Sequence, residues 1–167
     1  MTKKIVSILL ILCTAAAIVM LVINHNRTAA MKNFLTDYYS VSDSNAYQEF
    51  AKLSAEDIPS YLHDRYSDRM TESAIETAAA DRRILAPEQT ADEYSCTLVC
   101  NDVSLGRKSG YYSYTASVSV TFADGHTETL SLGGQIAEVK DGGAWKVDSF
   151  RPTESIVTAV SDLANSN

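Results

Sequence analysis

The sequence predicts an α+β fold in which an N-terminal transmembrane helix is followed by helices packed on a curved antiparallel sheet. Three observations predict it. A segment near the N-terminus, residues 5–23, has no charged side chain. The chain up to about residue 85 then repeats its apolar residues at helical spacing, and from residue 93 the spacing becomes that of strands. Helices and strands in separate blocks are typical of α+β domains.

The uncharged segment reads IVSILLILCTAAAIVMLVI and follows Lys3 and Lys4. As a helix it is about 28 Å long, close to the hydrocarbon thickness of a bilayer. Three interpretations compete: a cleaved signal peptide, a lipoprotein anchored at Cys13, and an uncleaved signal anchor. The apolar run is longer than that of a signal peptide, and a leucine precedes Cys13 where a small residue is needed. We therefore expect an uncleaved anchor.

The two lysines are expected to hold the N-terminus in the cytoplasm, which places the rest of the chain outside. The sequence thus divides into a cytoplasmic tail (1–4), a transmembrane anchor (5–23), an extracytoplasmic domain (24–152) and a C-terminal helix or tail (153–167). The predicted location is the cell membrane, crossed once, and the membrane is the first predicted partner.

The part of the chain after residue 24 is acidic. It holds all 21 Asp and Glu but only 12 of the 14 Lys and Arg, which gives it a formal charge of −9. Its basic residues are scattered and form no stripe along the sequence. Because binding to nucleic acid needs a basic surface, we expect no direct contact with nucleic acid.

The helical half is predicted from apolar residues at positions i, i+3 and i+4. Pro59 is tolerated only in the first turn of a helix, so one helix is expected to begin near Asp57. The segment APEQTAD, residues 86–92, is expected to end the helical half. Helices are predicted at about 28–39, 44–53, from 57 onward, at 67–84 and, after the sheet, at 156–163.

The strand half is predicted from alternating residues and from two Asp-Gly turns. In the strand that contains GYYSYTASVSVTF, Tyr112 and Tyr114 lie on the apolar face, and Ser113 begins a face of Ser and Thr. That polar face is either solvated or a flat docking surface for another subunit. Gly133-Gly134 predicts a bulge or bend. Strands are predicted at 93–105, 110–122, 126–140 and 144–150.

The last hairpin contains VKDGGAWKVDSF and the only tryptophan of the chain. Alternation predicts that Trp145, Val147 and Ser149 share one face of the last strand, opposite Phe150. The order of elements, closed by this hairpin, resembles the NTF2-like (cystatin-like, cone-shaped) superfamily over about residues 29–150. That resemblance implies helices cupped by a bent sheet, often with a pocket or a dimer, and no single function.

No catalytic, metal-binding or cofactor-binding constellation stands out. His63, Asp64 and Tyr66 occur together in HDRY, but the helical spacing turns His63 and Asp64 toward solvent. The three histidines are scattered, there is no CxxC pair and no phosphate-binding loop, so neither a metal nor a cofactor is expected. The tyrosines are core residues or pocket-lining residues, and the candidates for a pocket lining are Tyr112, Tyr114 and Trp145.

A membrane anchor followed directly by one such domain resembles the bitopic assembly subunits of bacterial type IV secretion and conjugation machines. The resemblance implies a non-enzymatic scaffold whose partners are other subunits of the membrane complex or further copies of itself. The alternative is a membrane-tethered small-molecule-binding protein or enzyme that uses the interior of the cone.

Overall fold

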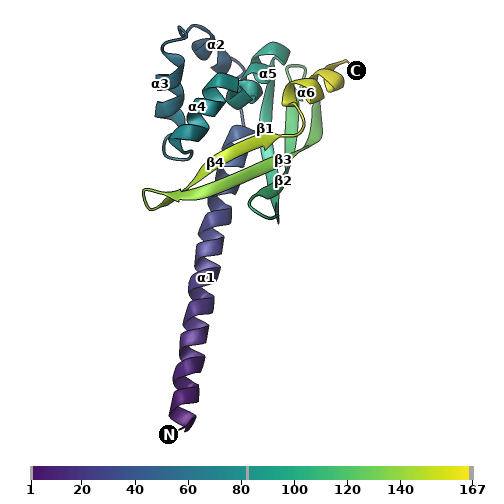
Figure 1. Cartoon of the computed structure of the whole chain (residues 1–167). Helices are drawn as coiled ribbons and strands as arrows, with labels where there is room; N and C mark the ends of the chain where they lie inside the picture. Colours follow the sequence, from purple (N-terminus) through teal and green to yellow (C-terminus); the bar gives the residue numbers. More distant parts are fainter. Residues whose placement is uncertain (1, 82, 166–167) are drawn as a thin grey trace.

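The computed structural model describes the backbone of residues 2–81 and 83–165, and the side chains of residue 14 and residues 18–81 and 83–165. The chain is α+β, as predicted, with one antiparallel sheet in the order β1-β2-β3-β4 (Figure 1). The elements are α1 Thr2–Tyr38, α2 Ala46–Ala51, α3 Ile58–Tyr66, α4 Glu72–Asp81, η1 Arg83–Leu85, α5 Ala86–Tyr94, β1 Cys96–Arg107, β2 Tyr112–Phe122, β3 Thr127–Asp141, β4 Ala144–Pro152 and α6 Ile156–Ala164.

Helix α1 runs without a break from the predicted anchor into the domain, and its N-terminal part extends away from the other elements (Figure 1). Six consecutive apolar residues, Ile18 to Ile23, are 48–74% exposed. Within the described residues, no helix has the length and apolarity that a membrane crossing requires. Most side chains of the predicted span 5–23, those of residues 5–13 and 15–17, lie outside the described residues.

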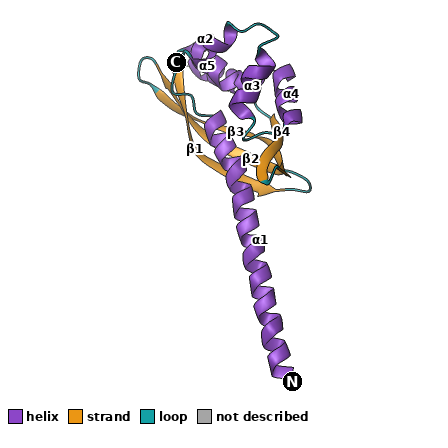
Figure 2. Cartoon of the chain, turned by 90° about the vertical axis from the view of Figure 1, so that its left-hand side faces the viewer, coloured by secondary structure: helices purple, strands orange, loops and turns teal. Residues whose placement is uncertain are grey.

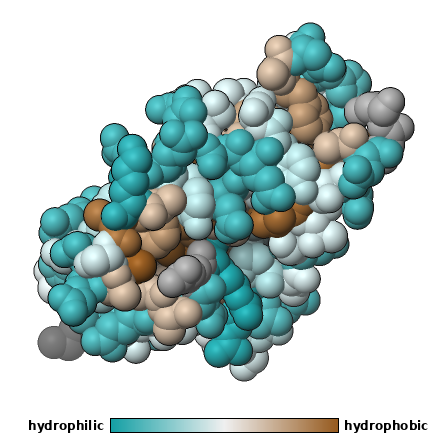
Figure 3. All heavy atoms as spheres, turned by 90° about the horizontal axis from the view of Figure 1, so that it is seen from above, coloured by the Kyte–Doolittle hydropathy of each residue, from teal (hydrophilic) through white to brown (hydrophobic). Residues whose placement is uncertain are grey.

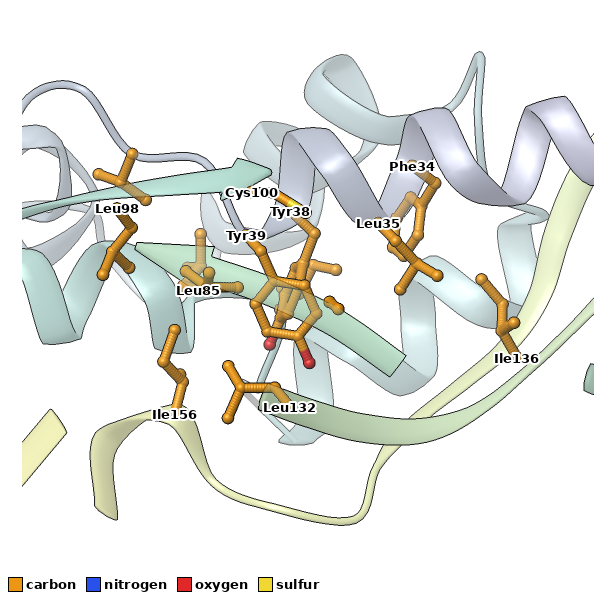
Figure 4. Close-up of a cluster of buried hydrophobic side chains, with 14 of the residues drawn as sticks. Phe34, Leu35, Tyr38, Tyr39, Leu85, Leu98, Cys100, Leu132, Ile136 and Ile156 are labelled. Atoms are coloured by element: carbon orange, nitrogen blue, oxygen red, sulfur yellow. The ribbon is translucent and has the colours of Figure 1, made fainter. Parts of the chain in front are cut away.

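The helices lie on one face of the sheet, which we call the inner face (Figure 2). Alternation produces this arrangement, because every second residue of β2 from Tyr112 to Val120 is buried. The C-terminal end of α1 lies over the same face, where Phe34, Leu35, Tyr38 and Tyr39 are in the core with residues of β1 and β3 (Figure 4). The inner face is therefore packed with side chains contributed mainly by the end of α1 and by the sheet itself.

The helix predicted at 67–84 is shorter in the structure, because residues before it pair with the sheet. The backbone N–H of Thr71 donates to Val147 O at 3.0 Å, and the N–H of Val147 donates to Arg69 O at 2.8 Å. These residues extend along the outer edge of β4, so α4 begins only at Glu72. The edge of the sheet is covered at this point by the chain itself.

Residues 86–92, expected from the sequence to end the helical half, lie in its last helix, α5, Ala86–Tyr94. Pro87 falls in the first turn of this helix, where a missing N–H costs nothing. The helix ends at Ser95, which adopts a left-handed backbone conformation with φ of 48°. The strand predicted from residue 93 consequently begins at Cys96.

Two details of the sheet differ from the sequence prediction. Of the bulge or bend predicted at Gly133 and Gly134, there is no bulge, because the β2–β3 register passes through both glycines without a shift. A register shift occurs instead in β4, where Ala137 pairs with Ser149 and Glu138 with Val147, leaving Asp148 as an extra residue. This bulge reverses the alternation. Phe150 therefore points inward, and its ring centre lies 5.3 Å from that of Phe34.

Candidate functional site at the junction of helix and sheet

A charged side chain of α1 lies between two aromatic rings of the sheet. The Nε of Arg27 donates a hydrogen bond to Oε1 of Glu138 on β3. The guanidinium carbon of Arg27 lies 5.5 Å from the centre of the Tyr112 ring and 5.1 Å from the centre of the Trp145 ring. Both distances are within the range of a cation–π contact. We call Arg27, Tyr112, Glu138 and Trp145 the junction cluster.

Strand register brings the three sheet residues of the cluster together. Tyr112 pairs with Ile136 across β2 and β3, and Glu138 follows two residues later on the same inner face. Trp145 pairs with Lys140 across β3 and β4. The turn at Gly142 and Gly143, both with positive φ, returns β4 so that Trp145 lies next to Glu138. Arg27 then reaches all three residues from α1.

The carboxylate of Glu138 is the electrostatic centre of the cluster. Its side chain is 0% exposed, whereas that of Arg27 is 30% exposed. Burial raises the pKa of the Glu138 carboxyl, and the hydrogen bond and charge of Arg27 oppose that rise. Among the described residues, Glu138 Oε2 and the Tyr112 hydroxyl have no hydrogen-bond partner. Arg27 is therefore the compensating charge that allows Glu138 to be buried.

Tyr114, the second predicted pocket residue, belongs to the aromatic core of the domain. Its hydroxyl lies 2.9 Å from the hydroxyl of Tyr39, and its ring is stacked on Phe150 with 5.8 Å between centres. Burial raises the pKa of Tyr39 to about 12 and also raises that of Tyr114. Neither hydroxyl can ionise readily near neutral pH, so this pair fills space and directs packing.

A second buried acid, which no sequence pattern predicts, lies among the helices. Glu88 of α5 is 5% exposed and accepts a hydrogen bond from Arg65 of α3. The Arg65 guanidinium lies 5.4 Å above the centre of the Tyr66 ring, and its Nη1 donates to the Tyr61 hydroxyl at 3.1 Å. Burial raises the pKa of Glu88, with Arg65 acting against it. Recognising Pro87 as a helix-start signal would have placed Glu88 on a helix, although not its partner.

The other polar candidates of the sequence are exposed or inert. The side chains of His63 and Asp64 are 51% and 83% exposed, on the solvent side as the helical spacing predicts. Cys96 and Cys100 are free and buried, and burial raises the pKa of both thiols. In the described part of the chain, no three His, Cys, Asp or Glu side chains gather in a way that could hold a metal ion.

Two hollows lie at the margins of the domain. One, of about 460 Å³, lies beside α1 and is lined by Trp145 together with Phe34, Asp37 and Arg69. The other, of about 360 Å³, lies between α4 and β4 and is lined by residues that include Ala74, Ile84 and Phe150. Of the three predicted pocket residues, Trp145 borders the first of these hollows and not the second, whereas Tyr112 and Tyr114 border neither.

Comparison of the chain with protein-family models, curated proteins and solved structures found no match. The fold and the site define an α+β domain whose sheet is fixed to a long helix through a buried ion pair and two aromatic rings. The resemblance to the NTF2-like superfamily stays a prediction.

Proposed function

We propose that this protein is a single-pass membrane protein whose NTF2-like extracytoplasmic domain is a non-enzymatic assembly module. The observation that carries the proposal is on α1. Ile18 to Ile23 present an exposed apolar surface, and four residues later Arg27 fixes the same helix to the sheet. A helix that only packed on its own domain would not expose six consecutive apolar residues to water.

The packing of the domain supports a scaffold rather than an enzyme. The space between the helices and the inner face holds the aromatic side chains of Tyr38, Tyr39, Tyr114 and Phe150, whose rings contact one another. The two buried carboxylates described here are each held by an arginine. General acid–base catalysis needs an ionisable group that can reach a substrate, and a packed interior offers little room for the alternative of a ligand inside the cone.

The setting we propose is a conjugative transfer (type IV secretion) apparatus in a bacterial membrane, and it rests on the resemblance described above. A helix in the bilayer keeps the domain close to the membrane and raises its local concentration beside neighbouring subunits. The partners are then other subunits of the same membrane complex. A rigid junction at Arg27 suits this role, because it gives the domain a fixed orientation relative to its anchor.

Affinity purification of the tagged full-length protein from membranes tests the proposal. We expect the protein in the membrane fraction, with its N-terminal segment retained by mass spectrometry and with other membrane proteins copurifying. Recovery of a protein that has lost residues 5–23, or that copurifies with no membrane protein, would contradict it. Substituting Leu21, 69% exposed, by Asp should release the protein from the membrane fraction, whereas Lys32→Asp should not.

A further inference from the structure

The face of the sheet that points away from the helices, which we call the outer face, carries no charge along its two central strands until Asp141 at the very end of β3. The register pairs Ser113 with Gln135, Thr115 with Gly133, Ser117 with Ser131, Ser119 with Thr129, and Thr121 with Thr127. Beyond these pairs, β3 adds Ala137 and Val139 to the same face. In a chain with 21% charged residues, twelve neutral residues in one patch are a marked depletion of charge.

The same face also holds two of the exposed apolar side chains of the folded domain. Apart from Ile18–Ile23 of α1, the large hydrophobic residues exposed in the described part of the chain are Val99, Tyr111 and Val139, at 52%, 36% and 43%. Alternation places Val99 and Val139 on the outer face, and Tyr111 lies in the turn just before β2. The end of the domain opposite α1 is mostly hydrophilic with small apolar patches (Figure 3). Depletion of charge together with exposed apolar groups distinguishes an interface from ordinary surface.

We propose that the outer face binds the outer face of a second copy of this chain, forming a twofold symmetric dimer. In such a dimer each patch faces an identical patch, so any net charge on it would face itself. Two domains that each carry a charge of −9 after residue 24 can approach closely only through a neutral surface. A different acidic or basic partner would instead be recognised by charges on this face.

The edges of the outer face are complementary to each other. Asp102 of β1 pairs with Ser117, and Arg151 of β4 pairs with Gln135, so both edge residues belong to the outer face. A twofold axis parallel to the strands lays the β1 edge of one copy over the β4 edge of the other. The edge that carries Asp102 in one copy then faces the edge that carries Arg151 in the other. Two sheets packed face to face keep their strands roughly aligned, as this axis requires.

The outer face is also large enough. Four strands spaced about 4.8 Å apart and a length of about 36 Å for β2 give a patch of roughly 700 Å². Stable interfaces bury about 600–1,000 Å² on each partner, so the area of the outer face falls within this range. The dimer does not depend on the proposed membrane role, since it would form through the domain alone.

Copurification of two differently tagged full-length chains, coexpressed in one cell, tests the dimer. Ser117 lies near the middle of the outer face, and Ser117→Asp should reduce copurification at least tenfold because two carboxylates then lie in one neutral interface. Ser73→Asp, at an exposed position of α4, is the matched control and should leave copurification unchanged. Equal copurification of wild type and Ser117→Asp would overturn the proposal and indicate association through α1.

A charge-swapped pair keeps the test independent of damage to the fold. Coexpression of Ser117→Asp with Ser117→Lys should restore copurification to near the wild-type amount, while each variant alone stays weak. Failure of the mixed pair to associate would overturn the proposal. A benzoylphenylalanine photo-crosslinker at position 117 should give a product of twice 18.2 kDa, and a product of another mass would assign the face to a different protein.

Discussion

Arg27 and Glu138 are 111 residues apart in sequence and form the ion pair that joins the long helix to the sheet. The carboxylate is fully buried, and the arginine reaches it from α1 between the rings of Tyr112 and Trp145. A rigid contact at this point fixes the direction in which α1 leaves the domain. The ion pair thus holds α1 against the sheet at a defined point.

Replacing Arg27 by Ala should destabilise the domain by about 3 kcal/mol, because the Glu138 charge is then buried without a partner. Thermal or urea unfolding of the purified full-length chain measures the effect. The double variant with Glu138→Gln should recover part of the loss, because the uncompensated charge is removed. Arg83→Ala is the control, since the Arg83 side chain is 66% exposed and its pair with Asp81 is a surface pair worth little. A stability of Arg27→Ala equal to that of Arg83→Ala would contradict the role of the pair.

Trp145→Ala should cost about 1–2 kcal/mol, less than the loss of a fully buried ring, because Trp145 is half-buried and its ring contacts the Arg27 guanidinium. The losses of unfolding free energy caused by Trp145→Ala and Arg27→Ala should not be additive. A double-mutant cycle should give an interaction energy of about 0.5–1 kcal/mol. Trp145 is the only tryptophan, so its fluorescence reports on the junction directly. Acrylamide should quench it more strongly in Arg27→Ala than in wild type; unchanged quenching would place Trp145 outside the junction.

Gly134→Ala should destabilise the protein by about 1–3 kcal/mol, because the new methyl group overpacks the core. A Cβ at this position would lie 2.5 Å from the Tyr114 hydroxyl and 2.6 Å from the carbonyl oxygen of Arg151. At the neighbouring Gly133 a Cβ would lie 3.5 Å from the nearest atom, so Gly133→Ala is the matched control and should be tolerated. Chemical denaturation of the two variants compares them, and equal stabilities would refute the packing argument. Tyr114→Phe should rescue Gly134→Ala only in part, because the contacts of the new Cβ with the Arg151 carbonyl oxygen and with the ring carbon Cε1 of residue 114, each 2.6 Å, remain.

The strands could be predicted to within a few residues because their signal is local. Alternation along β2 alone indicates which side chains point inward, and Tyr112 and Tyr114 are indeed buried. The role of Gly134 could not be predicted in this way, since it depends on Tyr114 across the strand pair. The inward turn of Phe150 was missed for the same reason, because the bulge at Asp148 is a property of β3–β4 pairing.

The candidate site also depends on contacts between residues far apart in the sequence, which local patterns do not predict. Trp145 and Tyr112 stand out in the sequence as aromatic residues of a sheet, but nothing local indicates that Arg27 lies between them. The partners of the two buried acids lie 111 residues away for Glu138 and 23 residues away for Glu88. A charged residue in a strand or helix is usually exposed, so sequence patterns assign both acids to solvent. Each acid meets its arginine only in the folded structure.

Glu88→Gln should make the stability of the domain less dependent on pH. Burial raises the folded-state pKa of Glu88 above its ordinary value of 4.5, so the folded state favours the protonated acid. The stability that Glu88 contributes is then fully present below that ordinary pKa and is lost as the pH rises through the raised pKa. Glutamine stays neutral and keeps an acceptor for Arg65. The melting temperature of Glu88→Gln relative to wild type should therefore rise between about pH 4 and pH 7.

Glu76→Gln, at an exposed position of α4, removes the same charge from the surface and provides the control. Its melting temperature relative to wild type should stay nearly constant across this pH range, because an exposed carboxylate is solvated in both states. If the melting temperature of Glu88→Gln relative to wild type were as constant with pH as that of Glu76→Gln, the folded-state pKa of Glu88 would not be raised. If it instead lost stability relative to wild type as the pH rises, Arg65 would hold the charged carboxylate more strongly than burial opposes it, and the direction argued here would be reversed.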